Sequence, residues 1–325
     1  MRTLRLPVLA CLLAVYLVWG TTYFAISVAL EGFAPLFQMA IRFLVAGALL
    51  MTFQRLRGAP LPTARQWRDC GAIGALLLGC GMGGVATAEQ WISSGATTVL
   101  IGALPLCAAL WSGVFGRRPG ALEWLAVLLG SIGVVLLTGG AEFRASPLGT
   151  AAILFAITCW SFGSQWSRRL DIPAGASGFA AEMLLGGTLL LIVSALKGES
   201  WAIAADWRPL LAWAYLVVFG SLIAFSAYMY LVAHVSPALA TSYAYVNPPV
   251  ALLVGAWLGG ETIAPETWTA LPLILGAVAL LAWAAARTPA GETVAQAQSF
   301  PASDRAVQPG FAIENAIDEP RCSAR

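Results

Sequence analysis

The chain has 325 residues, of which 59% are hydrophobic and only 10% are charged, and its mean hydropathy is +0.79. Soluble domains carry about 25% charged residues, so the composition excludes an ordinary soluble protein and predicts an all-α integral membrane protein. The formal net charge of +2 does not provide the basic surface that nucleic-acid binding needs. Six cysteines without a CxxC pair indicate neither a zinc nor a redox site, and we expect no metal and no cofactor.

Ten apolar segments follow one another along the chain, each near the length of about 17–25 residues that a membrane helix needs. They cover residues 6–29, 35–53, 70–88, 93–115, 121–140, 147–168, 175–196, 209–231, 236–259 and 266–286. The first segment follows Arg2 and Arg5, as a secretory signal would, but it lacks a small-residue cleavage pattern and further apolar segments follow it. We therefore expect it to remain a membrane helix.

Lysine and arginine are unevenly divided between alternate connecting segments. The amino terminus, every second loop and the residue after the last apolar segment together hold 11 of them, whereas the other five loops hold only Arg144, Lys197 and Arg208. Short loops with many basic residues face the cytoplasm. The sequence therefore predicts a multi-pass membrane protein with both termini in the cytoplasm.

The two halves of the chain share features at a nearly constant spacing. Trp19 and Trp160 are 141 residues apart, and Pro105 and Pro248 are 143 residues apart. Because each half holds five apolar segments, the second half must enter the membrane upside down, as in the inverted repeats of secondary transporters. The predicted domains are a first five-helix repeat over residues 6–140 and a second, inverted one over residues 147–287.

Residues 288–325 differ in composition from the rest of the chain. They contain no apolar segment, and Pro, Ser, Gln and Glu are scattered through them. Such a stretch cannot bury enough apolar surface to offset the entropy of ordering. We predict a disordered cytoplasmic tail that transport does not require.

The apolar stretch 235–261 contains Pro248 and Pro249 at its middle. Each proline removes an amide donor from a helix, which a membrane helix tolerates where the freed carbonyls face a cavity or a neighbouring helix. Pro105 occupies the matching position in the first half. Broken helices at matching positions of two halves predict the binding site of a transporter.

Four motifs carry a resemblance to a known family. They are YLVWGTTYF at 16–24, MAIRFLVAGALL at 39–50, SPALATSYAYVNP at 236–248 and LGGE at 258–261. With these motifs the chain resembles EamA-type transporters of the drug/metabolite transporter superfamily, and most of all its YedA-type inner-membrane exporters. The resemblance covers roughly residues 6–286. It implies ten transmembrane helices in two inverted-topology five-helix repeats, a central cavity, and export of small metabolites, amino acids or drugs by alternating access.

One departure from the superfamily concerns energy coupling. Its small multidrug members carry a membrane-embedded glutamate in the first helix, whereas the first apolar segment here contains no acidic residue. Their mechanism of proton coupling therefore cannot be transferred to that position.

Polar and aromatic residues gather at mid-depth in three of the predicted helices. The candidate substrate-binding residues are Trp19, Thr22, Tyr23, Pro105, Trp160, Ser164, Thr241, Tyr243, Tyr245, Asn247 and Pro248. Buried hydroxyl and amide groups need partners, which a hydrated cavity would supply, and aromatic faces suit apolar or cationic substrates. Hydrogen bonding between helices is the alternative explanation for the polar groups.

Ionisable residues inside a membrane are costly and point to function. Arg42, Glu89 and Glu182 are the candidates for coupling or gating. Arg42 and Glu182 belong to opposite leaflets in the predicted topology, so no salt bridge between them is expected. Arg42 either ties helix ends together or gates the outer mouth, Glu182 is a candidate carrier of a coupling proton, and Glu89 is either solvated or functional.

Two other classes of function are alternatives to a transporter. Gly175-Ala176-Ser177-Gly178 matches the GxSG motif of intramembrane serine proteases, and His234 falls on the same predicted side of the membrane. However, a serine at a helix start is a weak match, and we expect no enzyme. A passive channel would need rings of like charge or a carbonyl filter, which the sequence does not contain. The expected partners are a small-molecule substrate and the lipid bilayer, with a homodimer left open.

Overall fold

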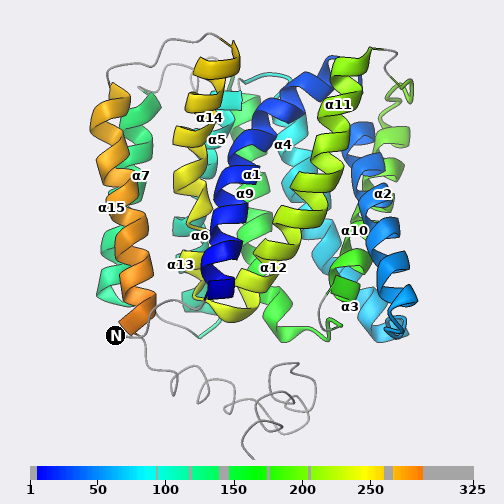
Figure 1. Cartoon of the computed structure of the whole chain (residues 1–325), viewed down its shortest axis with the longest axis horizontal. Coiled ribbons are helices and arrows are strands. Elements are labelled where there is room, and N and C mark those ends of the chain that lie inside the picture. The colour runs from blue at the N-terminus through cyan, green and yellow to red at the C-terminus, as the bar shows by residue number, and fades with distance from the viewer. Residues whose placement is uncertain are drawn as a thin grey trace, which may run out of the picture. The chain divides into compact units, whose positions relative to one another are not determined.

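The computed structural model describes residues 6–92, 94–116, 119–138, 146–173, 176–203, 206–259 and 266–287. All regular secondary structure in these residues is helical, and the helices stand side by side in one bundle (Figure 1). The predicted tail, residues 288–325, lies outside the described residues.

The helices of the first half occupy the first five predicted segments. They are α1 Leu6–Leu30, α2 Pro35–Leu56, α3 Ala64–Gly74 with the π-helix η1 Ala75–Met82 and α4 Gly83–Ala88, α5 Ser94–Ile101 with α6 Leu104–Val114, and α7 Ala121–Thr138.

The helices of the second half follow the same order. They are α9 Pro147–Trp166 with the 3-10 helix η2 Ser167–Arg169, α10 Ala176–Leu196, α11 Trp207–Tyr215 with the π-helix η3 Leu216–Ile223 and α12 Ala224–His234, α13 Pro237–Ala240 with α14 Tyr243–Gly259, and α15 Glu266–Arg287.

Six continuous helical stretches in the described part of the chain are long and apolar enough to cross a membrane. They are Leu6–Leu30, Pro35–Leu56, Ala64–Ala88, Pro147–Arg169, Ala176–Leu196 and Trp207–His234. Large apolar side chains on the outside of the bundle, such as Leu13, Leu49 and Trp257, are exposed, as lipid-facing side chains must be. The all-α membrane fold is therefore confirmed, while ten crossings remain a prediction.

Local sequence signals explain where several helices begin. Thr63 caps α3, since its side chain accepts from the Gln66 amide at 3.3 Å while Gln66 accepts from the Thr63 amide at 3.0 Å. Asp206 and Ser146 cap α11 and α9 in the same way with a side-chain oxygen. These side chains satisfy amide groups that have no partner within the helix.

The helix α2 has no side-chain cap from its own sequence, because the residue before it is Ala34. The cap comes instead from Glu199 after α10, whose carboxylate accepts from the Phe37 amide at 2.9 Å and the Leu36 amide at 3.3 Å. Ser194 also donates to this carboxylate at 2.8 Å. Glu199 therefore fastens the start of α2 to the end of α10, along which α2 packs extensively.

Two of the helical segments are interrupted, as the sequence predicts, but not at the prolines. The interruptions fall at residues 102–103, between α5 and α6, and at residues 241–242, between α13 and α14. Pro105 lies in the first turn of α6, where a missing amide costs nothing. Pro248 and Pro249 lie inside α14, so the helix continues through them despite the lost donors. The predicted position of the breaks is corrected accordingly.

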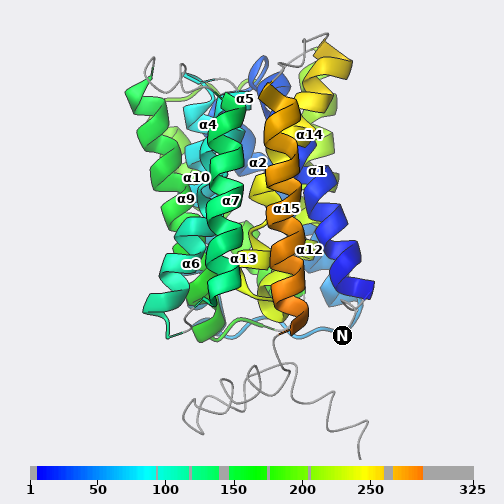
Figure 2. The same cartoon turned by 90° about the vertical axis from the view of Figure 1, so that its left-hand side faces the viewer.

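Corresponding elements of the two halves start at a constant spacing. The starts of α1 and α9, of α2 and α10, and of η1 and η3 are each separated by 141 residues. The first helix of each half also packs against helices of the other half. Helix α1 packs against α12 and α14, and α9 packs against η1 and α6. In Figure 1, α7 and α15 stand on one side of the bundle and α2, α3 and α10 on the other; Figure 2 views α7 and α15 face on.

Candidate substrate-binding cavity

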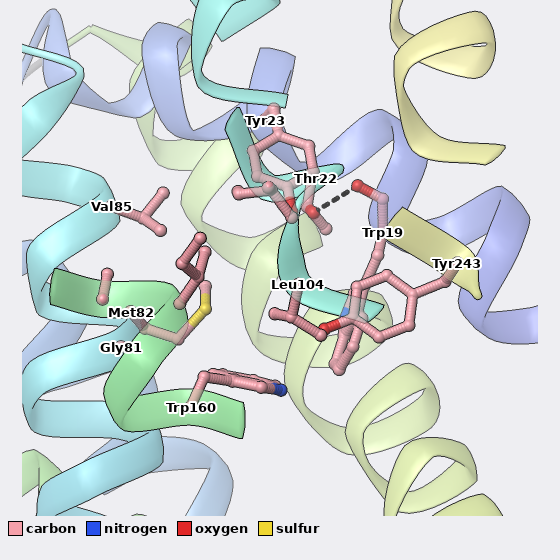
Figure 3. Close-up of a pocket in the computed structure, with 12 residues that line it drawn as sticks. Trp19, Thr22, Tyr23, Gly81, Met82, Val85, Leu104, Trp160 and Tyr243 are labelled. Carbon is pink, nitrogen blue, oxygen red and sulfur yellow. Dashed lines mark hydrogen bonds between the residues drawn. The ribbon is translucent and has the colours of Figure 1, made fainter. Parts of the chain in front are cut away.

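A small cavity lies where helices of the two halves meet (Figure 3). Its wall is formed by α1, η1, α4, α5, α6, α9 and α14. Five of the predicted substrate-binding residues line it, namely Trp19, Thr22, Tyr23, Trp160 and Tyr243. The remaining wall is apolar, with Met82, Val85 and Leu104 among its residues. Residues that are distant in sequence thus form one mainly aromatic and apolar site.

The cavity is small in the conformation seen here. Its volume is about 30 Å³, which is enough for water but far below the roughly 300–1,000 Å³ of pockets that hold drug-sized ligands. The helices around it would therefore have to separate before a metabolite could enter.

Trp19 is the centre of a cluster of aromatic side chains. The centroid of its ring lies 4.7 Å from that of Tyr243, 5.1 Å from Tyr228, 5.2 Å from Phe225 and 5.7 Å from Trp160. Three of these contacts are edge to face, the arrangement that the charge distribution of aromatic rings favours. The cluster connects α1, α9, α12 and α14.

Hydrogen bonds fix the orientation of the two indole rings. Trp19 Nε1 donates to the carbonyl oxygen of Gly220 at 3.2 Å, and Trp160 Nε1 donates to the Tyr228 hydroxyl at 2.9 Å. Ser164 is also 2.7 Å from that hydroxyl. Buried N–H groups are costly when unpaired, so these contacts hold the rings in place. Ser164 acts here as a support for Trp160 and Tyr228 and does not itself line the cavity.

The other predicted residues of the second broken helix lie around the cavity but not in its wall. Thr241 is buried at the interruption before α14. The Tyr245 hydroxyl donates to the Val127 carbonyl at 3.1 Å and so faces α7. Asn247 is fully buried beside Tyr23, yet its two amide atoms make no hydrogen bond of ordinary geometry within the described structure. Pro105 and Pro248 are structural neighbours of the site, and a direct role for all five stays a prediction.

Arg42 is fully buried on α2. Its Nε donates to Ser221 Oγ at 2.7 Å, and its guanidinium lies 5.1 Å from the centre of the Phe43 ring. Neither ion pair found among the described residues involves Arg42. An arginine charge held inside a membrane without a carboxylate contact is costly, which marks this residue for a function.

The two buried carboxylates are in different surroundings. Glu89 follows α4, and both of its oxygens are buried without a hydrogen-bond partner in the described part of the chain. Glu182 is 1% exposed on α10, in a turn that packs so closely on Gly74 of α3 that a side chain at Gly74 would collide with the Glu182 backbone. Of the two, Glu89 lies one turn beyond Val85 and is therefore near the cavity wall.

The prediction from the sequence did not include four residues that the structure places around Trp19 and Arg42. Two are aromatic residues of the cluster, and two are residues of η3 that accept hydrogen bonds. They are Phe225, Tyr228, Gly220 and Ser221. A signal exists, since Ser221, Phe225 and Tyr228 follow an i, i+4, i+7 spacing that places them on one helix face. This spacing does not stand out in the sequence, because the segment 209–231 is strongly apolar.

The residues proposed for a protease do not form a hydrolytic pair. His234 stacks on Tyr230 with ring centres 4.0 Å apart, and its Nδ1 pairs with the Tyr230 carbonyl at 2.8 Å. Ser177 is a buried residue of the first turn of α10. Neither arrangement supplies the serine–histidine hydrogen bond that nucleophilic catalysis needs.

Comparison with known proteins decides the family. The family described as EamA-like transporter matches residues 6–139 and 147–283. The chain belongs to this family. It is 43% identical to the uncharacterized inner membrane transporter YedA of Escherichia coli K12 over 277 residues, which are 85% of this chain and 90% of that protein.

More distant similarity extends to other organisms. The chain is 27% identical to a WAT1-related chloroplastic protein of Arabidopsis thaliana, over 83% of this chain and 67% of that protein, and 26% identical to the uncharacterized transporter YdfC of Bacillus subtilis, over 80% and 84%. A crystal structure of a protein with 22% identity superposes with a TM-score of 0.70 and covers 86% of this chain and 99% of the other, which shows the shared fold. The protein is thus a membrane transporter and not an enzyme.

Proposed function

We propose that the protein is a secondary transporter that exports small metabolites, amino acids or drugs by alternating access. The observation that carries the proposal is the aromatic cavity between the two halves, lined by Trp19 and Tyr23 from the first half and Trp160 and Tyr243 from the second. Ligand sites of transporters lie at such a repeat interface near the middle of the membrane. Thr22 supplies a hydroxyl in the same wall.

The proposed architecture consists of ten membrane helices in two inverted five-helix repeats, residues 6–140 and 147–287. It is supported by the constant spacing of 141 residues between helix starts and by the exchanged packing of α1 and α9. The family match, which falls on residues 6–139 and again on 147–283, agrees with this division.

Alternating access is supported by the small volume of the cavity and by the helix interruptions beside it. The interruptions at 102–103 and 241–242 divide two helices of the wall, so that each half-helix has its own point of bending. Only an outward or inward separation of the halves would make the cavity large enough for a substrate. Two modes of energy coupling fit this picture, namely proton antiport through Glu89 or Glu182 and uncoupled facilitation.

The proposed location is the inner membrane with both termini in the cytoplasm. The relative YedA is an inner membrane transporter by name, and the basic residues concentrate in the segments on the side of the termini. In Figure 1, the start of α1 and the end of α15 lie at the same end of the bundle, as an even number of crossings requires.

The proposal is tested by efflux from proteoliposomes that contain the full chain and are loaded inside with a mixed metabolite pool. We expect selective loss of a subset of compounds compared with liposomes without protein. An imposed pH gradient that accelerates the loss establishes proton coupling, and indifference to the gradient establishes facilitation. Absence of any selective loss would contradict the proposed function and leave the fold unaffected.

A further inference from the structure

The guanidinium of Arg42 is held at the junction of α1, α2 and η3. Its Nε is bound to Ser221 Oγ at 2.7 Å, and its Nη1 lies 3.7 Å from the Met39 sulfur, a weak acceptor. Its Nη2 is buried and has no hydrogen-bond partner in the described structure. The Arg42 guanidinium, a planar cation with several donors, is therefore oriented by one neutral hydroxyl. One of its N–H groups has no acceptor among the described residues.

This guanidinium lies directly behind the cavity wall. A methyl group placed on Gly220 would be 2.7 Å from Arg42 Nη2 and 3.2 Å from Thr22 Cγ2, so the two side chains meet over the same backbone position. Thr22 lines the cavity. Tyr23, the next residue of α1, lines the cavity as well. The absence of a side chain at Gly220 is thus what allows the cation to approach the site.

The chemistry of the surroundings indicates what the cation is for. A buried charge needs a partner of opposite sign or a large desolvation cost remains, and none of the contacts that Arg42 makes with the described residues supplies one. The buried oxygens of Glu89 make no hydrogen bond to the guanidinium in the described part of the chain. A ligand anion entering past Thr22 and Tyr23 would meet the free Nη2 and form a charge-assisted hydrogen bond.

We propose that Arg42 is an anion-binding residue of the transport site and that the substrates are apolar or aromatic molecules carrying a carboxylate. The aromatic cluster around Trp19 receives the apolar part, and the guanidinium, oriented by Ser221, receives the carboxylate. The inference rests on the proposed transport function and narrows its substrate class. Arg42 is then a specificity-determining residue and not a tie between helix ends.

The test uses the full chain in nanodiscs of phosphatidylcholine, which has no net charge, so that anionic lipid does not compete for the site. Calorimetry measures the binding of phenylacetate, phenylacetamide and phenethylamine, which share a ring and differ in charge. We expect phenylacetate to bind about tenfold more tightly than its amide, since a hydrogen bond to a charged group is worth at least that factor. Equal binding of acid and amide, or binding of neither, would overturn the proposal.

Three variants separate recognition from folding. Arg42→Gln is expected to lower the preference for the acid to about one, and Arg42→Lys to an intermediate value because it keeps the charge and loses the fork. Ser221→Ala, which keeps the charge and loses its orientation, is expected to reduce the preference severalfold, and it decides the matter if Arg42→Gln does not fold. The control is Arg208→Gln, which removes an exposed arginine and should leave the preference unchanged.

A double variant excludes mere charge balance with Glu89. If Arg42 only neutralised that carboxylate, Arg42→Gln combined with Glu89→Gln would recover the wild-type preference, and such recovery would refute the anion site. We expect no recovery. The efflux assay on the same preparation keeps the two proposals apart, since wild-type protein that exports selectively without a preference for carboxylates would defeat this inference alone.

Discussion

At the scale of single residues, the site is organised around the indole of Trp19. Four rings contact it, and one backbone carbonyl accepts its N–H. An indole so surrounded has little rotational freedom, and its face presents a fixed apolar surface to the cavity. Tyr243 is its nearest ring partner and also lies at a right angle to Tyr228, 5.7 Å away. Removing Tyr243 therefore alters the cavity wall while leaving the centre of the cluster in place.

Tyr243→Ala is expected to lower the efflux rate by up to about tenfold, because an aromatic pair contributes roughly 0.5–1.5 kcal/mol beyond its buried area. The amount of protein in the membrane should change little. Asn247→Ala should behave in the same way, because the buried amide lies beside Tyr23 of the cavity wall. The measurement is efflux normalised to membrane abundance, with Trp257→Ala as the comparison because Trp257 is an aromatic residue of α14 that is exposed on the outside of the bundle. Parallel losses of abundance and transport would instead assign Tyr243 to packing.

At the scale of helices, close contacts without side chains set the shape of the cavity. A methyl group on Gly81 of η1 would lie 2.8 Å from Trp160 Cε3, inside the contact distance of two carbon atoms. Gly113 of α6 has open space around the same position. There is therefore room for a side chain at Gly113 but not at Gly81.

Gly81→Ala is expected to push the Trp160 ring and reduce transport severalfold, since overpacking of a filled site costs about 1–3 kcal/mol. Gly113→Ala should transport normally and be as stable or slightly more stable, because alanine favours a helix over glycine by about 1 kcal/mol. Both are measured by efflux rate and thermal unfolding in detergent. Equal behaviour of the two variants would show that the contact with Trp160 is unimportant.

The cap on α2 makes a second prediction for a helix. Glu199→Ala leaves the Leu36 and Phe37 amides without their acceptor, so the free energy of unfolding should fall by about 1–2 kcal/mol. Lys197→Ala, in the same loop and exposed, should leave it unchanged. Thermal unfolding of the two purified variants provides the comparison. An unaltered melting temperature for Glu199→Ala would mean that water replaces the carboxylate at this helix start.

The sequence alone was sufficient for the fold class and for the segments that form helices, because apolar length is a local property. It also singled out Trp19, Trp160 and Tyr243, which line the cavity, because a polar or aromatic side chain stands out in an apolar segment. It did not identify Tyr228 and Phe225, whose place depends on how α12 packs against α1 and α9. Proline patterns misplaced the helix interruptions for a related reason, since a proline marks a lost amide and not where the chain bends.

At the scale of the whole molecule, the arrangement of charge determines orientation in the membrane. The eleven basic residues on one predicted side and three on the other favour a single topology. A green fluorescent protein fused after Arg287 should therefore fluoresce, and alkaline phosphatase fused there should be inactive. Phosphatase fused after Arg144 should be active, since that loop is predicted to lie outside. Active phosphatase after Arg287 would reverse the proposed orientation.

The π-helix η3 presents neighbouring residues to two different partners. The Gly220 carbonyl accepts from Trp19, and the Ser221 hydroxyl accepts from Arg42. A π-helix differs from an α-helix by its i→i+5 hydrogen bonds, and shifting the helix register by one residue turns each side chain by about 100°. Any return of η3 to α-helical register therefore changes both contacts together. The orientations of the Trp19 indole and of the Arg42 guanidinium thus depend on two adjacent residues of one helical turn.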